Sequence, residues 1–298
     1  MFSCPSPAMG RAEWHAPDAQ PGLAVDPPVM QRARGKLCVS LCQGEDGATR
    51  VVDLFQQGCL KVRLPRAEND NEADLVVMNT AGGLTGGDRV SIEVTAAAGA
   101  RVTVTTPGCE RIYRSAQGEA VIEQRLRVGP RARLDWVPQE TILYEGSRVR
   151  RRLQADLEDD AEITIVETIL FGRAAMGERL VHGAFSDFWT IRRDGRLIFA
   201  DGTRIGEGFQ QAVACPTALG GEVALTSLVH VGPDLAGKRD ALRAGFAGLA
   251  DVRAGASVVG DVLVARMVAP DGSGLRHALV PALGSLRHPR AVPRLWFC

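Results

Sequence analysis

Apolar and polar residues alternate in short runs along most of the chain, beginning near Arg32. A period of two places successive side chains on opposite faces of a β-strand. Four runs share a finer pattern, in which a small residue precedes strict apolar alternation: Ala73–Val77, Ala100–Val104, Ala132–Trp136 and Ala161–Ile165. They begin 27, 32 and 29 residues apart. A strand that recurs at this period predicts stacked sheets or helix-like β coils, in which each unit covers the apolar face of the next.

Turn residues interrupt these runs at two places. Four glycines lie within the six positions Gly82–Gly87, which Asp88 closes, and this density predicts positive-φ backbone or a very close approach. The run Ser91–Thr105 alternates as a strand pair would, and Thr106–Gly108 turns the chain again. We therefore expect a hairpin over Ser91–Thr105, followed by an exposed surface at Glu110–Arg114.

The ends of the chain follow other patterns. Residues 1–30 are rich in proline and lack periodicity, which predicts a disordered leader, and residues 31–298 are expected to form a single β-rich domain. Leucines at helical spacing predict helices near 233–250 and 275–287, with Pro281 kinking or interrupting the second. The predicted fold class is mostly β, with stacked β-sheets, β-helix-like repeats and two α-helices in the C-terminal third.

Composition narrows the possible partners and compartment. The 35 basic and 35 acidic residues balance, so no net charge favours nucleic acid or a membrane surface. Seven scattered cysteines without a Cys-x-x-Cys pair argue for a reducing compartment. No run of about 18 apolar residues is present. We expect a soluble, cytoplasmic protein.

Two common kinds of active site do not fit the sequence. The glycine cluster lacks the Lys-Ser/Thr pair of a phosphate loop, and Asp88 at its end would repel phosphate. Gly-x-Ser-x-Gly is absent, and none of the five dispersed histidines adjoins a recognisable nucleophile. These absences favour a protein that is not an enzyme.

Acidic residues within apolar, strand-like segments form the remaining anomaly: Glu140, Glu145, Glu167 and Glu178. Such carboxylates need an arginine partner, hydrogen bonds or water. Three interpretations remain open. The acids form salt bridges, they line a polar path for a cation, or two of Glu140, Glu145 and Glu167 serve as an acid/base pair in a β-rich hydrolase.

Several segments, taken in order, resemble the UreD family of urease accessory proteins, called UreH in some organisms. The matching segments are Gly82–Asp88, Thr106–Gly108, Tyr113–Ser115, Trp136–Glu140, Glu167, Gly172–Arg173, Gly177–Glu178, Arg193–Gly195 and Pro293–Trp296. The resemblance implies a non-enzymatic maturation factor that binds the urease apoprotein and the UreF/UreG accessory complex. It also implies that nickel, released by UreG and not tightly held, passes through this protein to the urease active site.

The resemblance also suggests residue roles. It implies that Glu140, Glu167 and Glu178 line the nickel path, and Cys109 could add a soft ligand. The implied partner surface comprises Gly82, Gly83, Gly86, Gly87, Asp88, Tyr113 and Arg114. The chain departs from the family pattern at Asn79–Ala81, where His-Pro-Pro is usual, and at Cys109, where alanine is usual. The alternatives to nickel transfer are a hydrolase with a carboxylate pair and a purely structural adaptor that never contacts metal.

Overall fold

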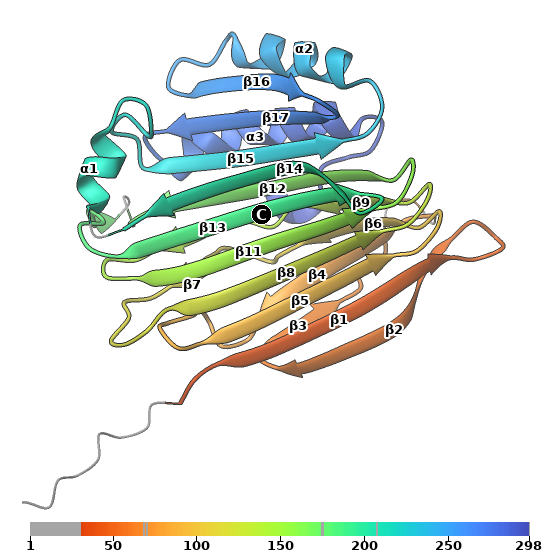
Figure 1. Ribbon diagram of the computed structural model, residues 1–298, viewed down its shortest axis with the longest axis horizontal. Helices are drawn as coiled ribbons and strands as arrows, with labels where there is room; N and C mark the ends of the chain where they lie inside the picture. The colour runs from red at the N-terminus through yellow and green to blue at the C-terminus, as the bar shows by residue number, and fades with distance from the viewer. Residues whose placement is uncertain (1–30, 68, 70, 174–175, 207, 298) are drawn as a thin grey trace, which may run out of the picture. The chain divides into compact units, whose positions relative to one another are not determined.

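The four repeated runs form neighbouring parallel strands in the computed structural model (Figure 1): β4 (Ala73–Asn79), β6 (Arg101–Thr105), β9 (Arg133–Trp136) and β12 (Glu162–Phe171). The structure describes residues 31–298 except 68, 70, 174, 175, 207 and 298, so the expected leader lies outside the described residues. Leu134 of β9 pairs with Val102 of β6 on one side and with Ile163 of β12 on the other. The prediction of stacked β coils is confirmed.

Between these strands the chain crosses to a second sheet. Its seven strands follow the order β14 (Arg196–Ile205), β13 (Ala184–Arg193), β11 (Arg148–Leu157), β8 (Ala120–Val128), β5 (Arg89–Ala96), β1 (Arg34–Gln43) and β2 (Thr49–Gly58). The pairs from β1 to β13 are parallel, whereas β1–β2 and β13–β14 are antiparallel. Each turn of the coil in this region therefore adds one strand to each sheet.

The first sheet has ten strands. Its main path is β16 (Arg253–Val259), β17 (Val262–Ala269), β15 (Ala224–Val231), β12, β9, β6, β4 and β3 (Leu60–Arg63). Two short strands lie off this path: β10 (Thr141–Leu143) pairs with β12 and with β7 (Glu110–Ile112). These short strands and their connections position four of the candidate site residues: Cys109, Tyr113, Arg114 and Glu140.

The expected hairpin over Ser91–Thr105 is wrong. β5 belongs to the seven-stranded sheet and β6 to the ten-stranded sheet, and Gly99 (φ 73°) turns the chain between them. The amide of Gly99 donates to the carbonyl of Pro130 in the next turn of the coil (2.9 Å). Alternation cannot separate the two arrangements, because each strand buries one face against the same core in either case.

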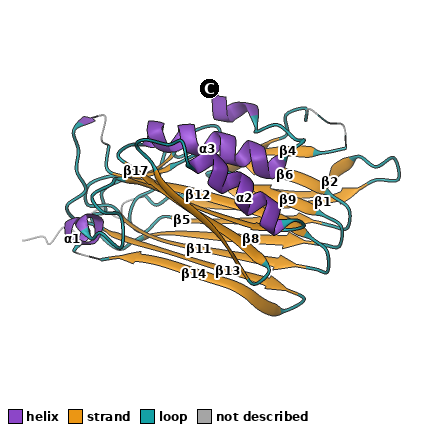
Figure 2. Ribbon diagram, turned by 90° about the horizontal axis from the view of Figure 1, so that it is seen from above, coloured by secondary structure: helices purple, strands orange, loops and turns teal. Residues whose placement is uncertain are grey.

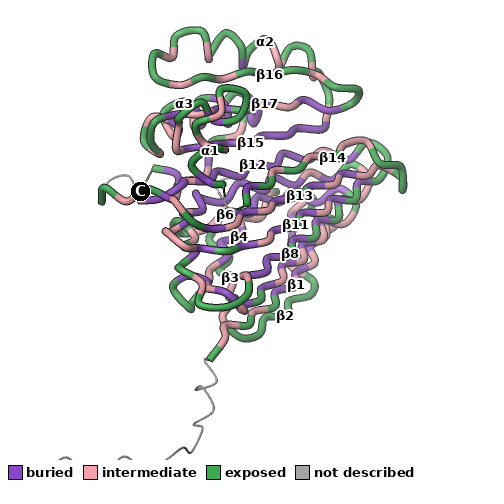
Figure 3. The backbone as a smooth tube through the Cα atoms, turned by 60° about the vertical axis from the view of Figure 1, so that its left-hand side comes forward, coloured by how far each residue is buried: buried purple, intermediate pink, exposed green. Residues whose placement is uncertain are grey.

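Two hydrophobic layers hold the coil. The larger lies between the sheets, and Ile163 and Ile165 of β12 belong to it. Val166 of the same strand belongs to the second layer, which packs under α2 (Leu235–Phe246) and α3 (Gly272–Arg287). Figure 2 shows both helices on one side of the strands, and Figure 3 shows the buried strand segments that they cover. β12 is therefore buried on both faces.

The two helices of the C-terminal third confirm that part of the fold prediction. Asp271 caps α3 by accepting a hydrogen bond from the Gly274 amide (2.8 Å). Pro281 does not interrupt α3, which continues to Arg287 because buried leucines anchor both sides of the proline. The six-residue helix α1 (Phe209–Ala214) was not predicted, since so short a segment carries little periodicity. None of the described helices has the length and hydropathy needed to cross a membrane.

Candidate surface of the glycine loop and the buried glutamates

The loop Gly82–Asp88 requires its glycines for two physical reasons. Gly82 (φ 76°), Gly83 (φ 145°) and Gly87 (φ 91°) adopt backbone conformations that other residues rarely reach. At Gly86 the reason is space, because a Cβ there would lie 1.9 Å from the Ser115 hydroxyl oxygen. The loop is a shaped structural turn.

Asp88 holds this loop together from inside. Its side chain is only 3% exposed, and its two carboxylate oxygens accept hydrogen bonds from the amides of Ala33 and Thr85, each at 2.8 Å. Carboxylate–amide bonds of this kind are among the stronger hydrogen bonds in proteins. The Asp88 carboxylate is therefore occupied within the loop. Of the four glycines, Gly82 is exposed and Gly87 is half-buried, whereas Gly83 and Gly86 are buried.

The loop is docked onto Tyr113 and Arg114. The Tyr113 hydroxyl donates to the carbonyl of Gly82 (3.0 Å), and the Thr85 hydroxyl donates to the carbonyl of Arg114 (2.8 Å). Tyr113 remains 37% exposed. The structure thus brings the predicted surface residues of the glycine loop and of the segment after β7 into one place.

An aromatic stack extends this surface to a third segment. The rings of Tyr113 and Tyr144 meet edge to face at 5.0 Å, and the guanidinium of Arg173 lies 4.4 Å from the Tyr144 ring centroid. Arg173 in turn donates to the carboxylate of Glu178 at 2.8 and 3.1 Å. Sequence reasoning missed Tyr144 in this role, although a signal existed, since these are the chain's only two tyrosines.

Glu178 lies in the connection between β12 and β13. Its hydrogen bonds with Arg173 hold the pKa of its carboxyl below the usual value. The Arg173 side chain is 39% exposed and that of Glu178 is 19% exposed, so solvent reaches the pair. We call Gly82–Asp88, Tyr113, Arg114, Tyr144, Arg173 and Glu178 the glycine-loop surface.

Glu140 lies elsewhere, where the segment after β9 meets α3. Both of its carboxylate oxygens accept hydrogen bonds from Arg276, at 3.0 and 2.8 Å. Arg276 also stacks 5.3 Å from the Trp296 ring and donates to the Trp296 carbonyl. Glu140 therefore ties the C-terminal residues to the coil.

Cys109 is the partner of Glu140 on the other side. Its sulfur donates to a carboxylate oxygen of Glu140 at 3.4 Å. Although the residue as a whole is exposed, desolvation of its sulfur, followed by the neighbouring Glu140 charge, raises the pKa of the thiol to about 11. Because metals bind the thiolate and not the thiol, this environment disfavours Cys109 as a nickel ligand at neutral pH.

Glu167 is the most enclosed of the three glutamates. Its carboxylate pairs with Arg151 and also accepts hydrogen bonds from the Trp136 indole (2.8 Å) and the Gln124 amide (3.2 Å). Arg151 also binds Asp187 at 2.6 and 3.0 Å. Burial raises the pKa of Glu167, and Arg151 opposes this effect.

The structure does not assemble the three glutamates into one site. Within residues 31–298, apart from the six positions not described, no hydrogen bond or ion pair joins any two of them. The same residues contain no group of three or more His, Cys, Asp or Glu side chains placed to hold a metal ion. A nickel path along these residues remains a prediction that would require their arginine pairs to open.

Asn79 lies at the start of the glycine loop, at the position where the UreD family pattern usually has a histidine. Its amide nitrogen donates to both carboxylate oxygens of Glu110, at 3.3 and 3.2 Å. Burial raises the pKa of Glu110. The departure from the family pattern thus places a neutral amide, not an imidazole, against this acid.

Comparisons with known proteins agree with these observations. A family model described as UreD urease accessory protein matches residues 33–297. A protein from Chelativorans sp. (strain BNC1) named urease accessory protein UreD is 45% identical over 271 residues, covering 91% of this chain and 96% of the relative. Proteins of the same name from Rhizobium etli and Agrobacterium fabrum are 43% and 40% identical, covering 90% and 92% of this chain and 96% and 94% of theirs. The chain belongs to the UreD family of urease accessory proteins.

Proposed function

We propose that this protein acts in urease maturation as a scaffold that binds the urease apoprotein and the UreF/UreG accessory complex. Family membership supports the biological process. The observation that best supports a binding role is the glycine-loop surface, in which the exposed Tyr113 is hydrogen-bonded to the loop and lies close to Arg114 and, through Tyr144, to Arg173. Tyrosine and arginine are enriched among the residues that dominate binding energy at protein interfaces.

The scaffold role is tested by removing Tyr113. In a pull-down with purified urease apoprotein, UreF and UreG, we expect Tyr113→Ala to weaken at least one contact about tenfold. Phe188→Ala is the matched control, since Phe188 is an exposed aromatic residue on β13. Unchanged binding of every partner by Tyr113→Ala would remove this surface from the proposal.

Nickel transfer is a second candidate function, and Glu178 supports it best. This carboxylate is paired but solvent-exposed, so exchange of Arg173 for a cation costs less than opening the buried Glu167 pair. The arginine pairs of Glu140 and Glu167 weaken the case for a path along those two residues. The purely structural adaptor therefore remains the main alternative.

Deleting the gene tests both functions in the cell. We expect urease to accumulate without nickel, as measured by metal analysis of the purified enzyme together with its activity. Fully metallated, active urease in the deletion strain would exclude both functions. Glu178→Ala separates them, because a scaffold alone predicts normal nickel loading, whereas a nickel path predicts reduced loading with the complex intact.

The hydrolase alternative gains no support from the arrangement of the carboxylates. The three carboxylates of that alternative are held by different partners: Glu140 by Arg276, Glu145 by His182 and Glu167 by Arg151. Glu167 lies in the core at 3% exposure, where a substrate cannot reach it without unfolding the sheets.

A further inference from the structure

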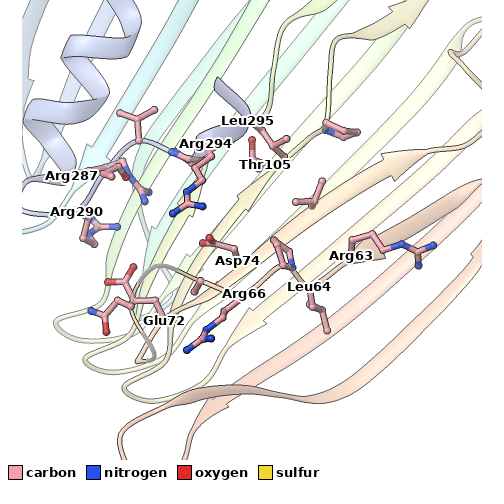
Figure 4. Close-up of a pocket in the computed structure, with 18 of the residues that line it drawn as sticks. Arg63, Leu64, Arg66, Glu72, Asp74, Thr105, Arg287, Arg290, Arg294 and Leu295 are labelled. Carbon is pink, nitrogen blue, oxygen red and sulfur yellow. The ribbon is translucent and has the colours of Figure 1, made fainter. Parts of the chain in front are cut away.

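A pocket of about 710 Å³ lies outside the glycine-loop surface. Three segments form its walls: the connection from β3 to β4, the end of β6 with Pro107, and the chain that follows α3. Figure 4 shows Arg287, Arg290 and Arg294 on one side, with Arg66 and Asp74 across from them. The residues discussed above as candidate nickel ligands or partner-surface residues do not line it.

The walls are largely apolar and conformationally restricted. Four prolines line the pocket: Pro65, Pro107, Pro289 and Pro293. Leu64 also lines it and is 49% exposed. Because proline fixes φ, walls of this kind lose little conformational entropy when something binds to them.

The inner wall carries an excess of positive charge. Arg287 and Arg290 both pair with Asp135, which is completely buried. Two guanidinium groups share this one carboxylate, and Glu72 and Asp74 supply further negative charge near Arg287. Glu72, one of the two acids that line the pocket, is already paired with Arg133 at 2.7 Å.

Three further arginines lie on the rim, and two of them, Arg66 and Arg294, also interact with other residues of the chain. Arg63, Arg66 and Arg294 line the pocket and are exposed to solvent. In total, five arginines and two acids line a pocket whose floor is apolar. An occupant complementary to it combines carboxylates with apolar side chains.

We propose that this pocket binds a short, extended, acidic segment of a partner protein, with apolar side chains against the prolines and carboxylates on the arginines. The volume falls within the range of about 300–1,000 Å³ for ligand sites, which suits a few residues and not a folded surface. Arginine clusters are a recurring means of recognising acidic motifs. The inference rests on the proposed scaffold role and adds a second contact to it.

The test uses the full-length chain and a fluorescein-labelled peptide of about ten residues that alternates leucine and glutamate. Two further peptides replace glutamate with serine or with lysine. By fluorescence anisotropy we expect the acidic peptide to bind at least about tenfold more tightly than the serine peptide, and the lysine peptide not to bind. Raising the salt from about 50 to about 300 mM should weaken the acidic complex.

Charge reversal locates the binding. The double variant Arg63→Glu/Arg294→Glu should weaken the acidic peptide about tenfold or more. Arg196→Glu is the matched control, because Arg196 is an exposed arginine at the β13–β14 turn and does not line the pocket. The control should bind as the unmodified chain does.

Three outcomes would overturn the proposal. The first is equal binding of the acidic and serine peptides, and the second is binding of the acidic peptide that the double variant leaves unchanged. The third is complete displacement of the acidic peptide by inorganic phosphate or citrate, added at the same concentration of anionic groups as the peptide supplies. That result would indicate a small-anion site. The assay contains neither urease nor nickel. Failure of the peptide to bind therefore does not contradict the scaffold role. Failure of the scaffold role in the pull-down likewise does not change the meaning of the peptide measurement.

Discussion

Two arginine–glutamate pairs of the same chemistry occupy opposite environments in this protein. Arg151 and Glu167 lie inside the sheets, each 3% exposed, whereas Arg173 and Glu178 lie in a surface connection at 39% and 19% exposure. A buried pair that loses one member leaves an uncompensated charge, while an exposed pair exchanges its partner for water or an ion at little cost. The first pair is suited to holding the fold and the second to changing partners.

The Arg276–Glu140 pair falls between these two extremes. Glu140 is buried, but the Arg276 side chain is 28% exposed and joins α3 to the coil. The three pairs form a series. Substituting one member of a pair should lower the free energy of unfolding less as the pair becomes more exposed. The first four experiments below test positions in that series.

Arg151→Met should have the largest effect on stability. It leaves Glu167 and Asp187 buried without their shared cation, which costs about 3–5 kcal/mol in the free energy of unfolding. Urea denaturation measures the change, with Arg152→Met as control because Arg152 on the same strand is exposed. A loss equal to that of the control would contradict the assigned role of the core pair.

The same variant should show a distinctive pH dependence. Burial already raises the pKa of Glu167, and removing Arg151 raises it further, so the folded state binds protons that the unfolded state releases. Stability of Arg151→Met should therefore fall as the pH rises from about 5 to about 8. A stability that rises over this range relative to the unmodified chain would be inconsistent with the burial argument.

Glu140→Gln should have an intermediate effect. It weakens two hydrogen bonds to Arg276, for a loss of about 1.5–3 kcal/mol in the free energy of unfolding. Because these bonds attach α3 and Trp296 to the coil, limited proteolysis should first release the C-terminal residues. Cleavage that begins elsewhere at the unmodified rate would argue against this attachment.

Glu178→Gln should change stability by no more than about 0.5 kcal/mol. Glu119→Gln is a suitable control, since Glu119 also forms a solvent-exposed pair, with Arg150. The informative measurement is the nickel content of urease matured with each variant at limiting nickel. Equal nickel content with both variants would exclude Glu178 from the path.

The last experiment measures the reactivity of two thiols in the unmodified chain, and we expect no change in stability. With a pKa of about 11, only roughly one Cys109 thiol in a thousand is ionised at pH 8. The hydrogen bond from Thr217 lowers the pKa of Cys215, so iodoacetamide should modify Cys215 faster than Cys109. Mass spectrometry of the alkylated peptides measures both rates, and faster modification of Cys109 would disprove its assigned environment.

The repeated strands could be predicted from sequence because their pattern is local. Ala100, Ala132 and Ala161 mark equivalent corners of the coil, and all three are buried. The placement of consecutive strands in different sheets was not accessible, since the apolar residues of β5 and β6 face the same core whichever sheet the strands join. The alternation of apolar and polar residues indicates which side chains are buried, but it does not indicate which strand lies beside them.

The partners of the candidate site residues could not be predicted in the same way. Glu140 and Arg276 are 136 residues apart, and the sequence offers many arginines to choose from. The glycine loop was anticipated because its backbone demands are local. Its contact with the Tyr113–Tyr144 stack depends on three separate connections meeting at one place, which no single segment records.

Synthesis from the N-terminus gives the final helix a particular importance. Asp135 and Glu140 leave the ribosome long before Arg276, Arg287 and Arg290, the cations that neutralise them. Until α3 docks, the nascent coil holds these acids without their countercharges, so it must keep them hydrated or protonated. A chain shortened by its last few dozen residues would lack those countercharges permanently and should fold less stably.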